Sequence, residues 1–126
     1  MLEAFSAVAF VPVSELSRAR DFYERVLGLT VVVSDERAVQ LDAHGTRIRL
    51  TAVPDLEPRP FTVLGWEVVD AEETARALAG AGVETLRFDW FDQDALGVWS
   101  APSGDKVAWF ADPDGNVLSI TEARAR

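Results

Sequence analysis

The chain of 126 residues is 48% hydrophobic and has a formal net charge of -9, so it is long enough to bury a core and too acidic for phosphate-rich partners. It has no cysteine, which excludes disulfides, thiolate zinc sites and cysteine nucleophiles. No apolar run approaches the roughly 20 residues that span a bilayer, and the first residues lack a signal-peptide pattern. We therefore expect one cytoplasmic domain, residues 1–126, that binds neither nucleic acid nor membrane.

The first half of the chain predicts a strand, a helix and three further strands. Residues 8–13 read as a strand, and Ser14 can cap a helix whose apolar stripe ends at Gly28. The three further strands are expected at residues 30–34, 38–42 and 46–51. If residues 43–45 form a three-residue hairpin loop, His44 is a solvated turn residue. The cross-strand pairs are then Asp42 with Thr46, Leu41 with Arg47, and Val39 with Arg49.

The second half repeats this order after a proline-rich connector at residues 54–60. A strand at 62–69, an Asp70-capped helix at 71–81 and a strand from Thr85 precede a closing hairpin. The chain therefore reads as an internal βαβββ duplication, with module one at about residues 4–53 and module two at about 61–122. Residues 92–105 have no counterpart of equal length, and such a segment is either a lid over a pocket or a plain surface loop.

The closing hairpin is the most informative stretch of the sequence. Asp112-Pro113-Asp114-Gly115-Asn116 predicts a three-residue turn in which Asp112 pairs with Asn116. Counting outward places Trp109 opposite Ser119 and Val107 opposite Thr121 on one face. The other face, which we expect to be core, carries Ala108, Phe110, Leu118 and Ile120.

Two motifs resemble the vicinal oxygen chelate superfamily, which includes glyoxalase I, extradiol dioxygenases and bleomycin-resistance proteins. They are Val13-Ser14-Glu15-Leu16 leading into Phe22-Tyr23, and the run from Trp109 to Asn116. The resemblance implies an α+β fold in which two tandem βαβββ modules form a curled mixed sheet around a cavity, with helices outside. It also implies a homodimer.

Metal-dependent members of that superfamily place a His, Glu or Gln at one position in each of four strands. The resemblance puts those positions at Val8, Arg49, Val63 and Ser119. Valine has no donor atom, arginine stays protonated, and a neutral serine hydroxyl is a poor ligand alone. The usual divalent metal is therefore predicted to be absent, no cofactor is expected, and glyoxalase or dioxygenase chemistry is disfavoured.

Strand parity predicts what lines the cavity instead. Phe10, Val39 and Trp109 would supply apolar walls, and the polar groups would be Arg47, Arg49, Glu67, Ser119 and Thr121. Arg49 and Glu67 either form an internal ion pair or leave Arg49 free for a carboxylate or phosphate. The tryptophan at 109 is either a core or dimer-contact aromatic or a stacking platform. Trp90, Phe91 and Trp99 either form an aromatic lid or pack the long segment down.

Three functional hypotheses remain open, and they leave undecided whether the protein is an enzyme. The first is a metal-independent protein of the glyoxalase/bleomycin-resistance type that sequesters a hydrophobic or aromatic small molecule in a dimer groove. Its expected ligand contacts are Phe10, Arg47, Arg49, Glu67, Trp99, Trp109 and Ser119. The second is a cofactor-independent lyase or isomerase with Glu67 as base and Arg49 as electrostatic stabiliser. The third is a non-catalytic scaffold whose own side chains fill the cavity.

Overall fold

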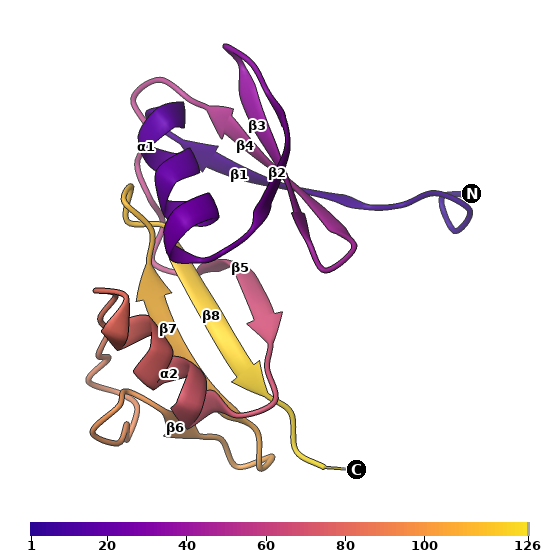
Figure 1. Cartoon of the computed structure of the whole chain (residues 1–126). Coiled ribbons are helices and arrows are strands. Elements are labelled where there is room, and N and C mark those ends of the chain that lie inside the picture. Colours follow the sequence, from indigo (N-terminus) through magenta and orange to yellow (C-terminus); the bar gives the residue numbers. More distant parts are fainter. Residues whose placement is uncertain (126) are drawn as a thin grey trace. The chain divides into compact units, whose positions relative to one another are not determined.

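The computed structural model describes residues 1–125, which fold as two compact units. The first unit is Met1–Glu57 and the second starts at Pro58, and each is described by itself (Figure 1). Each unit contains one four-stranded mixed sheet. This confirms the predicted α+β class with two βαβββ-type modules. Within residues 1–125 no helix combines the length and the apolar character needed to cross a membrane.

The first unit builds its sheet in the order β1-β4-β3-β2, with β1 parallel to β4 and the other neighbours antiparallel. Its elements are β1 (Val8–Val13), α1 (Leu16–Arg20), the π-helical η1 (Asp21–Val26), β2 (Thr30–Ser34), β3 (Ala38–Ala43) and β4 (Thr46–Ala52). The helix is capped by Glu15 rather than by Ser14, because the Glu15 carboxylate accepts from the N–H groups of Ser17 and Arg18, both at 3.0 Å. Gly28, at φ +79°, then ends the helical segment.

The core of the first unit lies between the helical segment and one face of the sheet. Its apolar side chains are Val11, Val13, Ala19, Tyr23, Val39, Leu41, Ile48 and Leu50, each no more than 2% exposed. Side chains alternate along a strand, so Val8 and Phe10 project from the opposite face and are 44% and 63% exposed. We call this opposite side the open face of the sheet.

The predicted pairing of β3 with β4 was wrong by one residue. The connection is a two-residue turn, His44-Gly45, in which both residues have positive φ, at +48° and +94°. This conformation is that of the tight hairpin turn whose twist matches the flanking strands, and histidine tolerates it. Ala43 therefore pairs with Thr46, and the next pairs are Asp42 with Arg47, Leu41 with Ile48, Gln40 with Arg49, and Val39 with Leu50. Val39 consequently faces the helix, and Gln40 takes the place on the open face that we had expected for Val39.

The second unit orders its strands β5-β8-β7-β6, with β5 parallel to β8. The elements are β5 (Thr62–Glu67), α2 (Ala71–Gly80), β6 (Trp99–Ser100), β7 (Lys106–Ala111) and β8 (Val117–Glu122). The expected strand from Thr85 is absent from this unit's described residues, where Thr85 makes only an isolated bridge with Phe110. The neighbour of β7 is instead the short β6, which lies within the long segment at residues 92–105.

The closing hairpin confirms the predicted register in full. Asp112 pairs with Asn116, Trp109 lies opposite Ser119, and Val107 lies opposite Thr121. The predicted core side chains Ala108, Phe110, Leu118 and Ile120 are at most 3% exposed. They belong to β7 and β8, which α2 contacts, and the ring of Trp66 stacks on Phe110 with centroids 6.2 Å apart. Here too, the other side of the sheet is the open face.

Candidate functional site: the open faces of the two sheets

Aromatic rings gather on the open face of the second sheet. Trp109 of β7 stacks on Phe91 with ring centroids 4.8 Å apart and planes 7° from parallel. Trp99 of β6 lies 4.3 Å from Phe91 and 6.1 Å from Trp109, and Phe88 meets Trp109 edge-on at 5.3 Å. Trp90 touches Phe88 and Phe91 but is itself 73% exposed. We call these side chains, Phe88, Trp90, Phe91, Trp99 and Trp109, the aromatic cluster.

Residues 85–99 carry every ring of this cluster except that of Trp109. The side chain of Gln93 holds this segment in place. Its Oε1 accepts from the N–H of Phe88 at 2.8 Å, and its Nε2 donates to the carbonyls of Leu86 and Gly97 at 2.9 and 2.8 Å. Three backbone groups of an irregular loop are thus satisfied by one amide. The segment is therefore built around the cluster, and its rings are positioned by specific hydrogen bonds.

Further polar side chains fix the same segment. The Thr85 hydroxyl donates to the carbonyl of Leu96 at 2.8 Å, and the Arg87 guanidinium donates to the carbonyls of Asp94 and Ala95. The segment also lines a cavity of about 320 Å³. The lining residues are Ala75, Ala79, Glu84, Thr85, Arg87, Ala95 and Leu96. Thr85 and Arg87 therefore both donate hydrogen bonds within the loop.

The predicted polar residues of the second unit lie beside the cluster on β5 and β8. Ser119 is opposite both Trp109 and Gly65, and a Cβ atom built at Gly65 would come within 2.6 Å of the Ser119 hydroxyl. Glycine at 65 therefore leaves room for that hydroxyl. Glu67 pairs in register with Thr121 at the end of β5 and is exposed.

The open face of the first sheet combines two arginines with apolar side chains. Arg49 lies over the ring of Phe10 at 5.9 Å from the centroid, in the geometry of a cation–π contact. Arg47, two residues earlier on β4, donates to Gln40 at 3.0 Å. Arg49 belongs to the first unit and Glu67 to the second, so their predicted ion pair stays a prediction.

The positions at which the resemblance places metal ligands do not fit a divalent cation. Val8 offers only an exposed isopropyl group, and the Arg49 cation sits against Phe10. Val63 lies in the irregular step of β5 between Thr62 and Leu64. Ser119 supplies one neutral hydroxyl. This donor set lacks the imidazole and carboxylate groups that divalent ions prefer, and we derive no chemical step through a metal.

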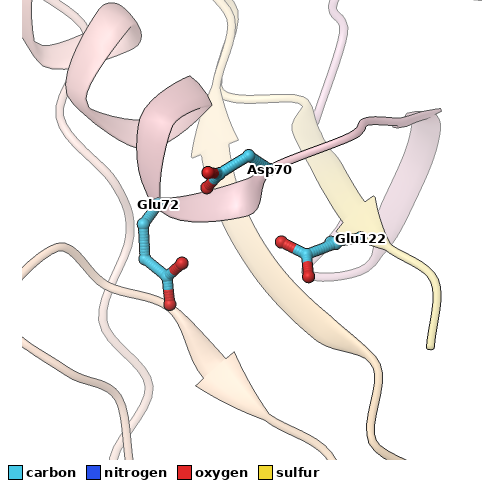
Figure 2. A group of neighbouring side chains, drawn as sticks. All are labelled: Asp70, Glu72 and Glu122. Atoms are coloured by element: carbon cyan, nitrogen blue, oxygen red, sulfur yellow. The ribbon is translucent and has the colours of Figure 1, made fainter. Parts of the chain in front are cut away.

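A cluster of three acidic side chains, which we call the acidic group, lies elsewhere, around the start of α2 (Figure 2). Carboxylate oxygens of Asp70, Glu72 and Glu122 lie within 4.8 Å of one another, but each has a structural partner. Asp70 caps the helix by accepting from the N–H of Glu73 at 3.0 Å, and Glu122 accepts from that of Ala71 at 2.9 Å.

Glu72 pairs with the ammonium group of Lys106 at 2.9 Å. The hydrogen bond from Lys106 to Glu72, together with the charge of that carboxylate, raises the pKa of Lys106 above its ordinary value. The acidic group is therefore accounted for by helix capping and by this ion pair.

Sequence reasoning located Trp90, Phe91, Trp99 and Trp109 but missed Phe88 and Gln93. Phe88 lies two and three residues before Trp90 and Phe91, and this spacing was a signal that it joins the rings of Trp90, Phe91 and Trp99. Gln93 carried no such signal, because a single glutamine in a loop matches no motif. Gln40 was missed because the predicted register of the β3–β4 hairpin was wrong by one residue.

The fold matches that of known proteins. A structure from Sphaerobacter thermophilus DSM 20745, titled as a member of the glyoxalase/bleomycin resistance protein/dioxygenase superfamily, is 24% identical, with a TM-score of 0.75 over 98% of this chain and 100% of that one. An antibiotic-binding protein from Streptomyces sp. CB03234 is 23% identical, with a TM-score of 0.72 over 98% and 99% of the two chains.

A lactoylglutathione lyase from Agrobacterium tumefaciens is 16% identical, with a TM-score of 0.73 over 96% and 94% of the two chains. No curated protein matches the chain by sequence. The family model of this superfamily matches residues 5–120, nearly the whole sequence. The chain therefore belongs to the glyoxalase/bleomycin resistance protein/dioxygenase superfamily.

Proposed function

We propose that the protein binds a small hydrophobic or aromatic molecule without the help of a metal, and that the aromatic cluster forms the binding surface. The observation that carries this proposal is the convergence of five aromatic rings on the open face of the second sheet. Stacked and edge-on rings present a large apolar area at a low cost in side-chain entropy.

The exposure of Trp90 supports this proposal. A tryptophan that is 73% exposed at the margin of a packed cluster leaves its apolar surface in water, and a flat ligand would cover that surface. The hydrogen bonds of Gln93 hold the neighbouring rings in place before any ligand arrives. Binding to a pre-organised surface loses little free energy to ordering.

Among the relatives, the antibiotic-binding protein supports a binding role, and the lactoylglutathione lyase shows that the fold also carries catalysis. For this chain, the lyase or isomerase hypothesis rested on a carboxylate at Glu67 in apolar surroundings. Glu67 is exposed, so this observation does not favour it. The scaffold hypothesis needed Val8, Val63 and Phe10 to fill a cavity, and Val8 and Phe10 remain exposed while Val63 is half-buried. We also propose that the protein is cytoplasmic and acts as a homodimer whose groove holds the ligand.

The experiment is a tryptophan fluorescence titration with menadione, an uncharged planar aromatic compound that a cysteine-free protein cannot capture through a thiol. The variants are Trp109→Leu and Trp90→Leu, and the matched control is Phe61→Leu, which changes a ring that is 58% exposed in the same unit. We expect saturable quenching that weakens about fivefold to tenfold in the two tryptophan variants and is unchanged in the control.

The protein is purified without a metal-affinity tag, and its metal content is measured by mass spectrometry. Menadione binding that survives both tryptophan substitutions contradicts the role of the cluster. Stoichiometric metal, or thermal stabilisation by Zn(II), Ni(II), Mn(II) or Fe(II) that saturates at one site, contradicts metal independence and returns metalloenzyme chemistry to consideration.

A further inference from the structure

One face of β4 presents a row of hydrogen-bond donors. Side chains at positions 47, 49 and 51 share the open face of the first sheet because strand residues two apart point the same way. They are Arg47, Arg49 and Thr51. Their neighbours in register on β1 are Val8, Phe10 and Pro12, which supply an apolar border without donors or acceptors in their side chains.

Two atoms of this row are buried without a hydrogen-bond partner among the described residues: Arg47 Nε and Thr51 Oγ1. Buried polar atoms are almost always paired, and an unpaired donor costs free energy. Arg47 has one hydrogen bond through its side chain, from a terminal nitrogen to Gln40 at 3.0 Å, which leaves its Nε–H available. The two orphan atoms belong to residues four apart on one strand, about 13 Å between their Cα atoms, so one bound carboxylate can reach only the arginine end of this row.

Arg49 adds a positive charge that no carboxylate of the first unit pairs with at ion-pair distance. Asp35 lies within electrostatic reach, since hydrogen bonds from the N–H groups of Arg37 and Ala38 lower its pKa and the charge of Arg49 adds to this effect. Those two N–H groups already engage the Asp35 carboxylate. Asp42 is the register partner of Arg47, but its carboxylate accepts from the N–H of Gly45 at 3.4 Å.

We propose that this face, which we call the donor row (Arg47, Arg49 and Thr51), binds a small organic anion whose carboxylate group lies at Arg47 and Arg49 and whose apolar body lies against Phe10. A guanidinium offers a planar fork that matches a carboxylate in two parallel hydrogen bonds. The ring of Phe10, 63% exposed and 5.9 Å from the Arg49 guanidinium, offers an apolar surface for the rest of the ligand. The formal charge of -9 alone would favour a cationic ligand. On this face, however, the half-buried guanidinium groups of Arg47 and Arg49 have unused donors, and they favour an anion.

The proposal goes beyond the proposed function, because it places a second site on the first unit and depends only on residues of that unit. The competing occupant is the carboxylate of Glu67 in the same or a second copy of the chain. That occupant would make the donor row an internal ion pair instead of a ligand site.

The test uses benzoate as the probe and benzamide as its uncharged analogue of similar shape. Each is titrated into the full protein while the amide and arginine Nε–H signals are followed by NMR. We expect benzoate to shift the Arg47 Nε–H signal and the β4 amides in a saturable way that weakens at high salt, and benzamide to leave them unchanged. In Arg49→Gln the apparent Kd for benzoate should rise at least about tenfold, whereas Arg25→Gln, an exposed arginine that pairs with Asp21 at 3.6 Å, should match the wild type.

Glu67→Gln separates the two occupants. If benzoate binds only after Glu67 is neutralised, the donor row is filled by that carboxylate and the proposal is wrong. Equal shifts with benzoate and benzamide, or no saturable shift in the wild type and in Glu67→Gln, also overturn it. Trp109→Leu leaves the donor row intact, so benzoate should bind this variant as it binds the wild type. If menadione fails to bind the wild type while benzoate still binds it, only the proposed function has failed.

Discussion

The ring of Phe91 lies almost parallel to the indole of Trp109, with 4.8 Å between centroids, so a loop residue and a strand residue form the centre of the aromatic cluster. Replacing Phe91 with Ala removes the ring that touches Phe88, Trp90, Trp99 and Trp109 at once. We expect unfolding in urea, followed by far-UV circular dichroism, to show a loss of about 1–3 kcal/mol, less than for a fully buried phenylalanine because Phe91 is half-buried. Phe61→Ala, the exposed control, should change stability by less than about 0.5 kcal/mol. Equal losses in the two variants would mean that the cluster contributes no packing of its own.

The amide of Gln93 is predicted to control the order of the loop more than the stability of the unit. Gln93→Ala leaves the Phe88 N–H and the carbonyls of Leu86 and Gly97 without their side-chain partner. Amide hydrogen exchange should therefore accelerate at residues 86–97 by about tenfold or more, with protection in β7 and β8 retained. The adjacent exposed residue gives the control, Asp92→Ala, which should leave exchange unchanged. Unaltered protection in Gln93→Ala would show that the ring contacts alone hold the loop.

The closing hairpin shows which part of the fold the sequence predicts well. Asp112 accepts from the N–H groups of Asp114 and Asn116 at 2.9 and 3.0 Å, and from the Asn116 side chain at 2.9 Å. Gly115 takes φ +86°. Every residue of this turn has a preference that agrees with the observed geometry, so the turn fixes the register of β7 and β8 and therefore the face on which Trp109 lies.

The candidate site was harder to predict where local signals were weak or contacts were long-range. His44-Gly45 fits both a two-residue and a three-residue loop, and that one-residue choice decided whether Val39 or Gln40 lies on the open face. The cluster depends on contacts between residue 109 and residues 88–99, which no periodic pattern reveals. Residues 92–105 were recognised as an insertion, but the hydrogen bonds of Gln93 to Leu86, Phe88 and Gly97 are irregular and follow no turn rule.

The register of β3 and β4 should be sensitive to the residue at 45. Gly45 has φ +94°, and a Cβ atom built there meets nothing within 4 Å, so Gly45→Ala introduces backbone strain without a clash. We expect a loss of about 1–2 kcal/mol in denaturant unfolding. Gly80→Ala is the matched control, because a Cβ there also meets nothing within 4 Å but the residue is helical, so the substitution should stabilise by up to about 1 kcal/mol. Stabilisation by both substitutions would contradict the two-residue turn.

Asp35 should make the stability of the protein depend on pH in the acid range. Hydrogen bonds from the N–H groups of Arg37 and Ala38 lower its pKa in the folded state below the ordinary value of 3.8. A lowered folded pKa gives a stabilisation that is present above pH 3.8 and is lost as the pH falls through the folded pKa. Asp35→Asn keeps an acceptor oxygen but no charge, so the wild type should unfold at a higher temperature than the variant at neutral pH, and the difference should shrink as the pH falls below 3.8 and through the folded pKa. Thermal unfolding across this range measures the effect, with the neighbouring exposed Glu36→Gln as the control. A difference between wild type and Asp35→Asn that does not change with pH would show that the turn gains nothing from the charge of this carboxylate.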